Sequence, residues 1–339
     1  MVSIIIPAYN AAAVIEHCLA SVIRQDYEDW EALVVNDCSS DNTKKQVEAI
    51  IQQNPERVIR CIDLTSNCGV AHARNTGILE SKGDYLYFLD ADDEIYPNAL
   101  SCLVSAIEDC DMALGGHDVT SNGPTKHSQM IVREGKCFIG YDVIKGFADG
   151  CWHVMPWNKL IKKSFITDNK LFFPENLRFH EDYVWNVFSA CKAKKIRLVA
   201  EQTYNYIVNA DSITSKLTIE RDLKGYISAF NAIVSFYKEN ELCQGVAEYH
   251  LLEGKKSGVM YSLLQIGETK LFDTYYKDFR ESCVVSPYIA WKSHIISAAY
   301  FLRDAHYLLP ISLGKAYKKC FYWLLYKFRG KKIEGAIWQ

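Results

Sequence analysis

The chain has 339 residues, of which 49% are hydrophobic and 23% are charged, and its formal net charge is −3. This composition is typical of a folded globular protein and excludes a disordered or low-complexity chain, and the length suggests about two domains. A weakly acidic chain has no global field that attracts nucleic acid, so we expect no nucleic-acid partner.

The 12 cysteines are scattered from Cys18 to Cys320 and form no C-x-x-C pair. A zinc ribbon or thioredoxin motif is therefore not expected, and disulfide frameworks are typical of short secreted chains. The first residues show no signal-peptide pattern, and no run of about 18 uncharged apolar residues occurs. We therefore predict reduced thiols in a cytoplasmic protein without a transmembrane helix.

The first hundred residues alternate between strand and helix patterns. Apolar or β-branched runs predict strands at residues 2–6, 32–35, 58–64, 85–89 and 112–114. Helical spacing predicts a helix after Asn10, which is expected to cap it, and further helices up to about residue 51 and over residues 69–80. This alternation predicts an α/β fold with helices on both faces of a mainly parallel sheet.

The rest of the chain changes character twice. Residues 115–155 are irregular and predict a loop or short strands over the sheet, and a helix is expected to begin at Glu181. Beyond about residue 216, long helical stretches follow. We therefore predict two domains, a sheet-containing domain at 1–215 and a helical region at 216–339.

Polar residues follow the predicted strands at the point where each strand ends. They are Tyr9, Asn10, Asp37, Asn67 and the acidic run Asp90–Asp93. Ligands of parallel sheets bind outside the carboxyl ends of the strands, so one crevice is expected to collect these side chains.

Two of these acidic sites have a functional and a structural interpretation. Asp90 and Asp92 can hold a divalent cation that also contacts substrate phosphates, or they form an acidic turn before the next helix. Asp37 can accept a hydrogen bond from a base or ribose, or it forms an Asx turn. The glycine-rich phosphate loops of dinucleotide folds and P-loops are absent from the sequence.

Three further motifs also have both a functional and a structural interpretation. Arg74 can pair with a phosphate or a carboxylate, or it ties a helix to the sheet. The carboxylates of Glu181 and Asp182 can include a general base, or they favour the positive end of a helix. Trp157 can offer its face to a sugar ring, with Asn158 or Lys159 donating hydrogen bonds, or these residues belong to the core and surface.

The order of these motifs resembles glycosyltransferase family 2, whose members have the GT-A fold. The resemblance spans residues 1–215 and rests on the following segments: 2–10, 35–43, 69–78, 90–93, 157–160 and 181–182. It implies transfer of a sugar from a nucleotide diphosphate donor, for which we expect a UDP-sugar, to an acceptor hydroxyl with inversion. It also implies a divalent cation, Mn²⁺ or Mg²⁺, and an acceptor that is a glycan or lipid-linked oligosaccharide in surface polysaccharide synthesis.

The resemblance also implies roles for individual residues. Asp182 would be the catalytic base, supported by Glu181 and His180, and Asp92 would be the metal ligand, with Asp93 a weaker candidate. Trp157 would lie near the donor sugar or acceptor. The nucleotide would be bound by Pro7, Tyr9, Asp37, Asn67, Arg74, Asp90 and Ala91.

The sequence departs from the family at the Asp-Asp-Gly-Ser turn, which is Asn36-Asp37-Cys38-Ser39 here. A cysteine in place of glycine predicts a negative φ at Cys38.

Residues 315–332 contain seven basic residues and no acid, interleaved with aromatic residues. Such a helix could bind an anionic membrane surface. Alternatively, it is a terminal helix that packs on the protein and exposes its basic edge to water. With this interpretation, the protein would be peripheral at the inner face of the cell membrane.

Two other functions compete with glycosyl transfer. A sugar-phosphate nucleotidyltransferase has a similar sheet, but it has a glycine-rich basic loop after the first strand, where this chain has Pro7-Ala8-Tyr9-Asn10. The other alternative is a sugar- or nucleotide-binding module without catalysis.

Overall fold

The structure is a computed structural model, and it describes residues 1–121, 126–128, 135–208, 219–240, 251 and 263. The chain divides into two units, Met1–Leu217 with Ser228–Leu251, and Thr218–Ile227 with Leu252–Gln339. All contacts reported below lie within the first unit. The predicted domain boundary at 215/216 and the predicted basic helix at 315–332 lie outside the described residues.

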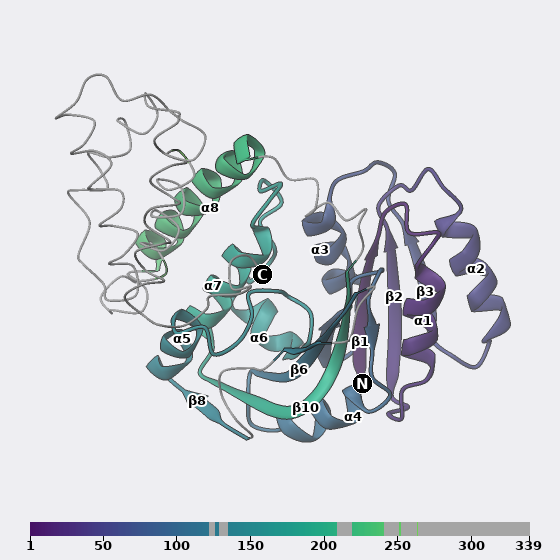
Figure 1. The fold of residues 1–339 in the computed structure, drawn as a ribbon, viewed down its shortest axis with the longest axis horizontal. Helices are drawn as coiled ribbons and strands as arrows, with labels where there is room; N and C mark the ends of the chain where they lie inside the picture. The colour runs from purple at the N-terminus through teal and green to yellow at the C-terminus, as the bar shows by residue number, and fades with distance from the viewer. Residues whose placement is uncertain (122–125, 129–134, 209–218, 241–250, 252–262, 264–339) are drawn as a thin grey trace, which may run out of the picture. The chain divides into compact units, whose positions relative to one another are not determined.

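Strands and helices alternate along the chain from β1 to β4, and the later elements do not alternate strictly (Figure 1). The first nine elements are β1 (Val2–Ala8), α1 (Ile15–Ile23), β2 (Trp30–Asn36), α2 (Thr43–Gln53), β3 (Ile59–Asp63), α3 (Val70–Glu80), β4 (Tyr85–Phe88), β5 (Glu94–Ile95) and α4 (Ala99–Ile107). The others are β6 (Met112–Thr120), β7 (Lys126–Ser128), β8 (Cys137–Ile139), α5 (Tyr141–Ala148), β9 (Lys159–Lys162), α6 (Lys163–Asp168), α7 (Glu181–Lys192), β10 (Lys195–Ile207) and α8 (Ile219–Glu239).

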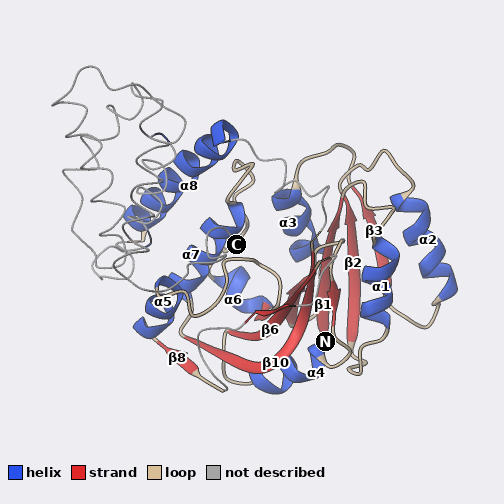
Figure 2. Cartoon of the chain, in the orientation of Figure 1, coloured by secondary structure: helices blue, strands red, loops and turns tan. Residues whose placement is uncertain are grey.

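The strands form one sheet, drawn in red in Figure 2. Its strand order is β3-β2-β1-β4-β9-β6-β10-β5, with β7 paired to β6 and β8 paired to β10. The pairs β3–β2, β2–β1 and β1–β4 are parallel, as the sequence predicts for its first four strands. Beyond β4 the sheet is mixed, because β9 runs antiparallel to both β4 and β6. The predicted α/β fold class is confirmed, with the parallel half formed by residues 2–88.

Both faces of β1 are buried. Ile4 and Ile6 lie in the core cluster together with Leu19 of α1 and Leu103 of α4. Ile5 points to the opposite face, where a Cβ on Gly77 of α3 would come within 2.3 Å of it. A strand covered on both faces needs no polar alternation, which explains the nearly unbroken apolar run.

The interpretation of 115–155 as loops or short strands was wrong for residues 115–120. These residues continue β6, which pairs with β9 and β10 inside the sheet. A Cβ on Gly115 would lie 1.9 Å from Thr203 Oγ1 of β10, so a glycine is needed for the close approach of the two strands. Among the described residues, no helix is long and apolar enough to cross a membrane.

Candidate active site

The ends of β1, β2 and β4 lie at one edge of the sheet, because these strands are parallel neighbours. Asn10, after β1, is bonded to the turn that follows β2: its N–H donates to Ser39 Oγ at 2.9 Å and its Oδ1 accepts from the Ser40 N–H at 2.9 Å. The expected capping role of Asn10 was wrong, since α1 begins five residues later and Asn10 has φ 50°.

Asp37 organises the turn before α3. Its carboxylate accepts hydrogen bonds from the N–H groups of Cys68 and Gly69, both at 2.8 Å, and its side chain is 3% exposed. Asn67 Nδ2 donates to the Asp37 carbonyl at 3.3 Å. Tyr9, which is 51% exposed, and Asn67 are the accessible predicted nucleotide contacts here.

The expectation of a negative φ at Cys38 was wrong. Cys38 has φ 57°, in the left-handed region that glycine adopts most easily. The turn geometry expected of a glycine is therefore kept by a cysteine, at a cost in backbone strain of about 1 kcal/mol.

The four residues of the acidic run have different environments. Asp90 pairs with Arg74 Nη2 at 3.0 Å, and Ala91 is buried in the core cluster. Asp93 is buried and accepts from Tyr204 Oη at 2.6 Å and from a backbone N–H at 2.8 Å. Burial, with the charge of Asp90, raises the pKa of Asp93 to about 8. Asp93 therefore holds β10 in place and Asp90 is paired with Arg74, so Asp92 is the partly exposed carboxylate of the run that no described cation pairs with.

Asp92 is the residue that the family resemblance predicts as the metal ligand. It is half-buried, and burial together with the charge of Asp90 raises its pKa. Among the described residues, no group of three or more His, Cys, Asp and Glu side chains could hold a metal ion. Mg²⁺ commonly uses one or two carboxylates and completes its coordination with substrate phosphates and water. Asp92 fits that mode, in which the diphosphate itself supplies ligands.

The start of α7 lies beside the acidic run. Arg74 Nη1 of α3 donates to Glu181 Oε1 at 3.3 Å, while Nη2 binds Asp90, so one buried guanidinium joins the two segments. Burial raises the pKa of Glu181 despite this cation. Asp182 Oδ1 accepts from the Tyr183 N–H at 2.6 Å, and His180 precedes the helix with φ 64°.

Trp157 does not present an open face for a sugar ring. It is 5% exposed and stacks on Tyr204, with ring centroids 4.3 Å apart. Asn158 Nδ2 donates to the carbonyls of Gly115 and Gly116, and Lys159 Nζ donates to the His153 carbonyl at 3.3 Å and to the Met155 carbonyl. The three residues are buried and fix the segment at the start of β9, so the structural interpretation holds for the core and not for the surface.

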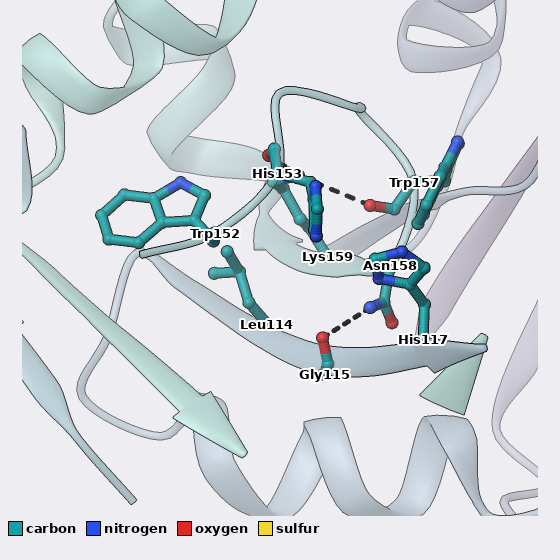
Figure 3. A pocket seen from close by; sticks show the side chains of 8 residues that line it. All are labelled: Leu114, Gly115, His117, Trp152, His153, Trp157, Asn158 and Lys159. Carbon is teal, nitrogen blue, oxygen red and sulfur yellow. Dashed lines mark hydrogen bonds between the residues drawn. The ribbon is translucent and has the colours of Figure 1, made fainter. Parts of the chain in front are cut away.

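A small cavity lies between this loop and β6 (Figure 3). Its lining includes His117 and His153, whose rings are 4.6 Å apart, and Lys159. Burial lowers the pKa of His117 to about 4 and that of Lys159 to about 7. Sequence reasoning missed His117 and Tyr204, because neither lies in a recognisable motif. For Tyr204, the available signal was the alternation of apolar and polar residues at the start of β10, which could have predicted the strand that contains it.

His117 is expected to make the folded state sensitive to acid. An exposed histidine in the unfolded chain binds its proton near pH 6.5, whereas His117 in the folded protein does so near pH 4. Stability is therefore lost as the pH falls between these values, by about 3 kcal/mol. Urea unfolding at pH 7 and pH 4 should show that His117→Gln loses less stability than the wild type. Exposed His17→Gln is the control, and equal losses in all three proteins would contradict the expectation.

The sheet and the helices that cover it have the GT-A fold. The structure of S. aureus TarS 1–349 in complex with UDP-GlcNAc has a similar fold, with a TM-score of 0.63 and 19% identity, and the match covers 83% of this chain and 81% of that chain. Residues 3–167 match the model of Glycosyl transferase family 2. The chain therefore contains a domain of glycosyltransferase family 2.

Two relatives illustrate the similarity. "Uncharacterized glycosyltransferase YibD" of Escherichia coli is 29% identical over 219 residues, or 62% of each chain. The chain thus covers less than two thirds of the length of that relative. "Poly(ribitol-phosphate) beta-N-acetylglucosaminyltransferase TarP" of Staphylococcus aureus is 25% identical over 277 residues, covering 80% of this chain and 81% of the relative. Both names are those of transferases.

Proposed function

We propose that this protein is an inverting, metal-dependent glycosyltransferase. It moves a sugar from a UDP-sugar to a hydroxyl of a glycan or lipid-linked oligosaccharide in surface polysaccharide synthesis. The observation that supports this best is the buried Arg74 guanidinium, which binds Asp90 on one side and Glu181 on the other. This bridge supports a single site for Asp92 and Asp182, the next acidic residues of the two segments.

In the proposed mechanism, Asp182 accepts the proton of the acceptor hydroxyl as the oxygen attacks the anomeric carbon. Asp182 stands in the first turn of α7. Attack from the side opposite the nucleotide inverts the anomeric centre, and no covalent intermediate is needed. A divalent cation held by Asp92 would supply Lewis-acid neutralisation of the leaving diphosphate.

The nucleotide is proposed to lie along the ends of β1 and β2. Tyr9 and Asn67 are exposed there. Asp37 accepts hydrogen bonds from two backbone N–H groups of the turn before α3, and so holds the turn that contains Asn67. UDP is favoured because the TarS neighbour was solved with UDP-GlcNAc, and a glycan acceptor is favoured by the name of TarP. A cytoplasmic location and contact of residues 315–332 with an anionic membrane remain proposals.

Nucleotide binding should stabilise the protein only when a divalent cation is present. UDP at about a hundred times its dissociation constant should add about 2.7 kcal/mol. The measurement is thermal unfolding with UDP, GDP, dTDP or CMP, each with Mn²⁺ or with a chelator. UDP with Mn²⁺ should give the largest shift.

Asp92→Ala should abolish this shift, because it removes the proposed protein ligand of the cation. Asp168→Ala, at an exposed residue of α6, is the matched control and should keep the shift. An unchanged shift in Asp92→Ala would show that the cation site lies elsewhere, and no shift with any nucleotide would argue against a nucleotide-sugar transferase.

A further inference from the structure

The side-chain amide of Asn75 ties α3 to the segment that precedes α7. Its Oδ1 accepts a hydrogen bond from the Phe173 N–H at 2.8 Å, and its Nδ2 donates to the Phe173 carbonyl at 2.9 Å. The same Nδ2 donates to Glu175 Oε1 at 2.8 Å. Asn75 is buried, and its two bonds to Phe173 are buried as well, so they satisfy polar groups that water does not reach.

Phe173 in turn lies between the two segments that contain the proposed site. Its ring meets Phe88, the last residue of β4, edge to face at 5.2 Å, and it stacks on Trp185 of α7 at 4.6 Å. All three rings are fully buried. Trp185 is three residues beyond Asp182, so it lies on the same side of α7. The three aromatic rings therefore set the separation between β4 and the first turn of α7.

Arg74, the neighbour of Asn75 in α3, acts on the other end of the same segment. It binds Glu181 and Asp90, and its guanidinium lies 5.3 Å from the centre of the Phe173 ring. Two consecutive residues of α3 thus hold residues 173 and 181 at the two ends of the connection into α7.

We propose that Asn75 is a positioning residue for the transfer reaction: by locking Phe173 between β4 and α7, it sets where Asp182 stands relative to Asp92. This inference rests on the proposed function, because the placement of Asp182 matters only if Asp182 is the base. A side-chain amide suits the role because it donates and accepts at once. Aspartate cannot donate, and leucine can do neither.

The test compares Asn75→Ala with Gln25→Ala. Gln25 is also a buried amide with three backbone hydrogen bonds, to Ser21, Tyr96 and Leu100, and it contacts none of the proposed site residues. With UDP-GlcNAc as the probe and water as the nucleophile, kcat should fall about 100-fold in Asn75→Ala, as expected for a misplaced base. The KM for the donor should change less than about threefold. In Gln25→Ala, both kcat and KM should stay at their wild-type values.

Hydrogen exchange gives a readout that does not depend on activity. Amides of residues 173–184 should exchange about tenfold faster in Asn75→Ala than in the wild type, and Gln25→Ala should leave them unchanged. Asn75→Asp keeps the bond from the Phe173 N–H and loses both donated bonds, so it replaces the alanine variant if that variant does not fold.

Three results would overturn the inference. They are an equal kcat in Asn75→Ala and Gln25→Ala, unchanged exchange over residues 173–184, and a loss in Glu175→Ala as large as in Asn75→Ala. Glu175→Ala keeps both hydrogen bonds between Asn75 and the backbone of Phe173, so it should retain the wild-type kcat. Failure of the proposed function looks different, because Asp182→Asn would then keep the wild-type rate whatever the exchange measurement shows.

Discussion

Asp182→Asn is expected to lower the rate of sugar transfer by about 10²–10⁴-fold and to leave UDP affinity unchanged. Asparagine has nearly the shape of aspartate but cannot take the acceptor's proton. Asp182 lies in the first turn of α7, whereas the predicted nucleotide contacts lie at the ends of β1 and β2. The measurement is UDP release from a UDP-sugar, together with the thermal shift produced by UDP and Mn²⁺.

Glu181→Gln is the matched control for this prediction. Glu181 is also a carboxylate of the first turn, but it is paired with Arg74, so its loss should affect folding stability more than the chemical step. A larger rate loss in Glu181→Gln than in Asp182→Asn would make Glu181 the base. Equal near-zero rates in the wild type and Asp182→Asn would favour a binding module without catalysis.

Arg74→Met is expected to cost about 3–5 kcal/mol of unfolding free energy, the usual penalty for removing one partner of a buried ion pair. Both carboxylates that it binds would keep their burial and lose their cation. The pKa of Glu181, already raised by burial, should rise further. Because the folded state would then hold this proton to a higher pH than the unfolded state, the loss should grow as the pH rises.

Urea unfolding of Arg74→Met beside Arg57→Met measures this effect. Arg57 pairs with the exposed Glu28, so its loss should cost about 1 kcal/mol or less. Adding Glu181→Gln to Arg74→Met should recover part of the loss, because it removes one uncompensated charge. Similar losses in the two arginine variants would mean that the buried network contributes little.

The parallel half of the sheet could be predicted because its strands are short apolar runs buried on both faces. The mixed half could not, since the strand that contains Gly115 and Gly116 has the turn residues of a loop. Gly115 is explained by Thr203 and Gly116 by Gln202, two residues of β10 that lie almost ninety positions further along the chain. A long-range close approach leaves no local pattern in the sequence.

The candidate site, like the sheet, could be predicted only in part. Its place at the strand ends could be predicted, because parallel strands bring their carboxyl ends to one edge. The family resemblance favoured Asp92 over Asp93 as the ligand, but the contacts that bury Asp93 could not be predicted, since they come from Tyr204 and the backbone of β10. The role of Asn75 was equally hidden, because it depends on Phe173.

The bond from Tyr204 to Asp93 has a consequence for folding during synthesis. The two residues are 111 positions apart, so the acidic turn is released from the ribosome well before the strand that buries Asp93. Until β10 inserts beside β6, Asp93 remains hydrated and the turn lacks its support. We therefore infer that a nascent chain ending before β10 cannot yet form the site, and that competence for substrate arises only with this late, long-range pairing.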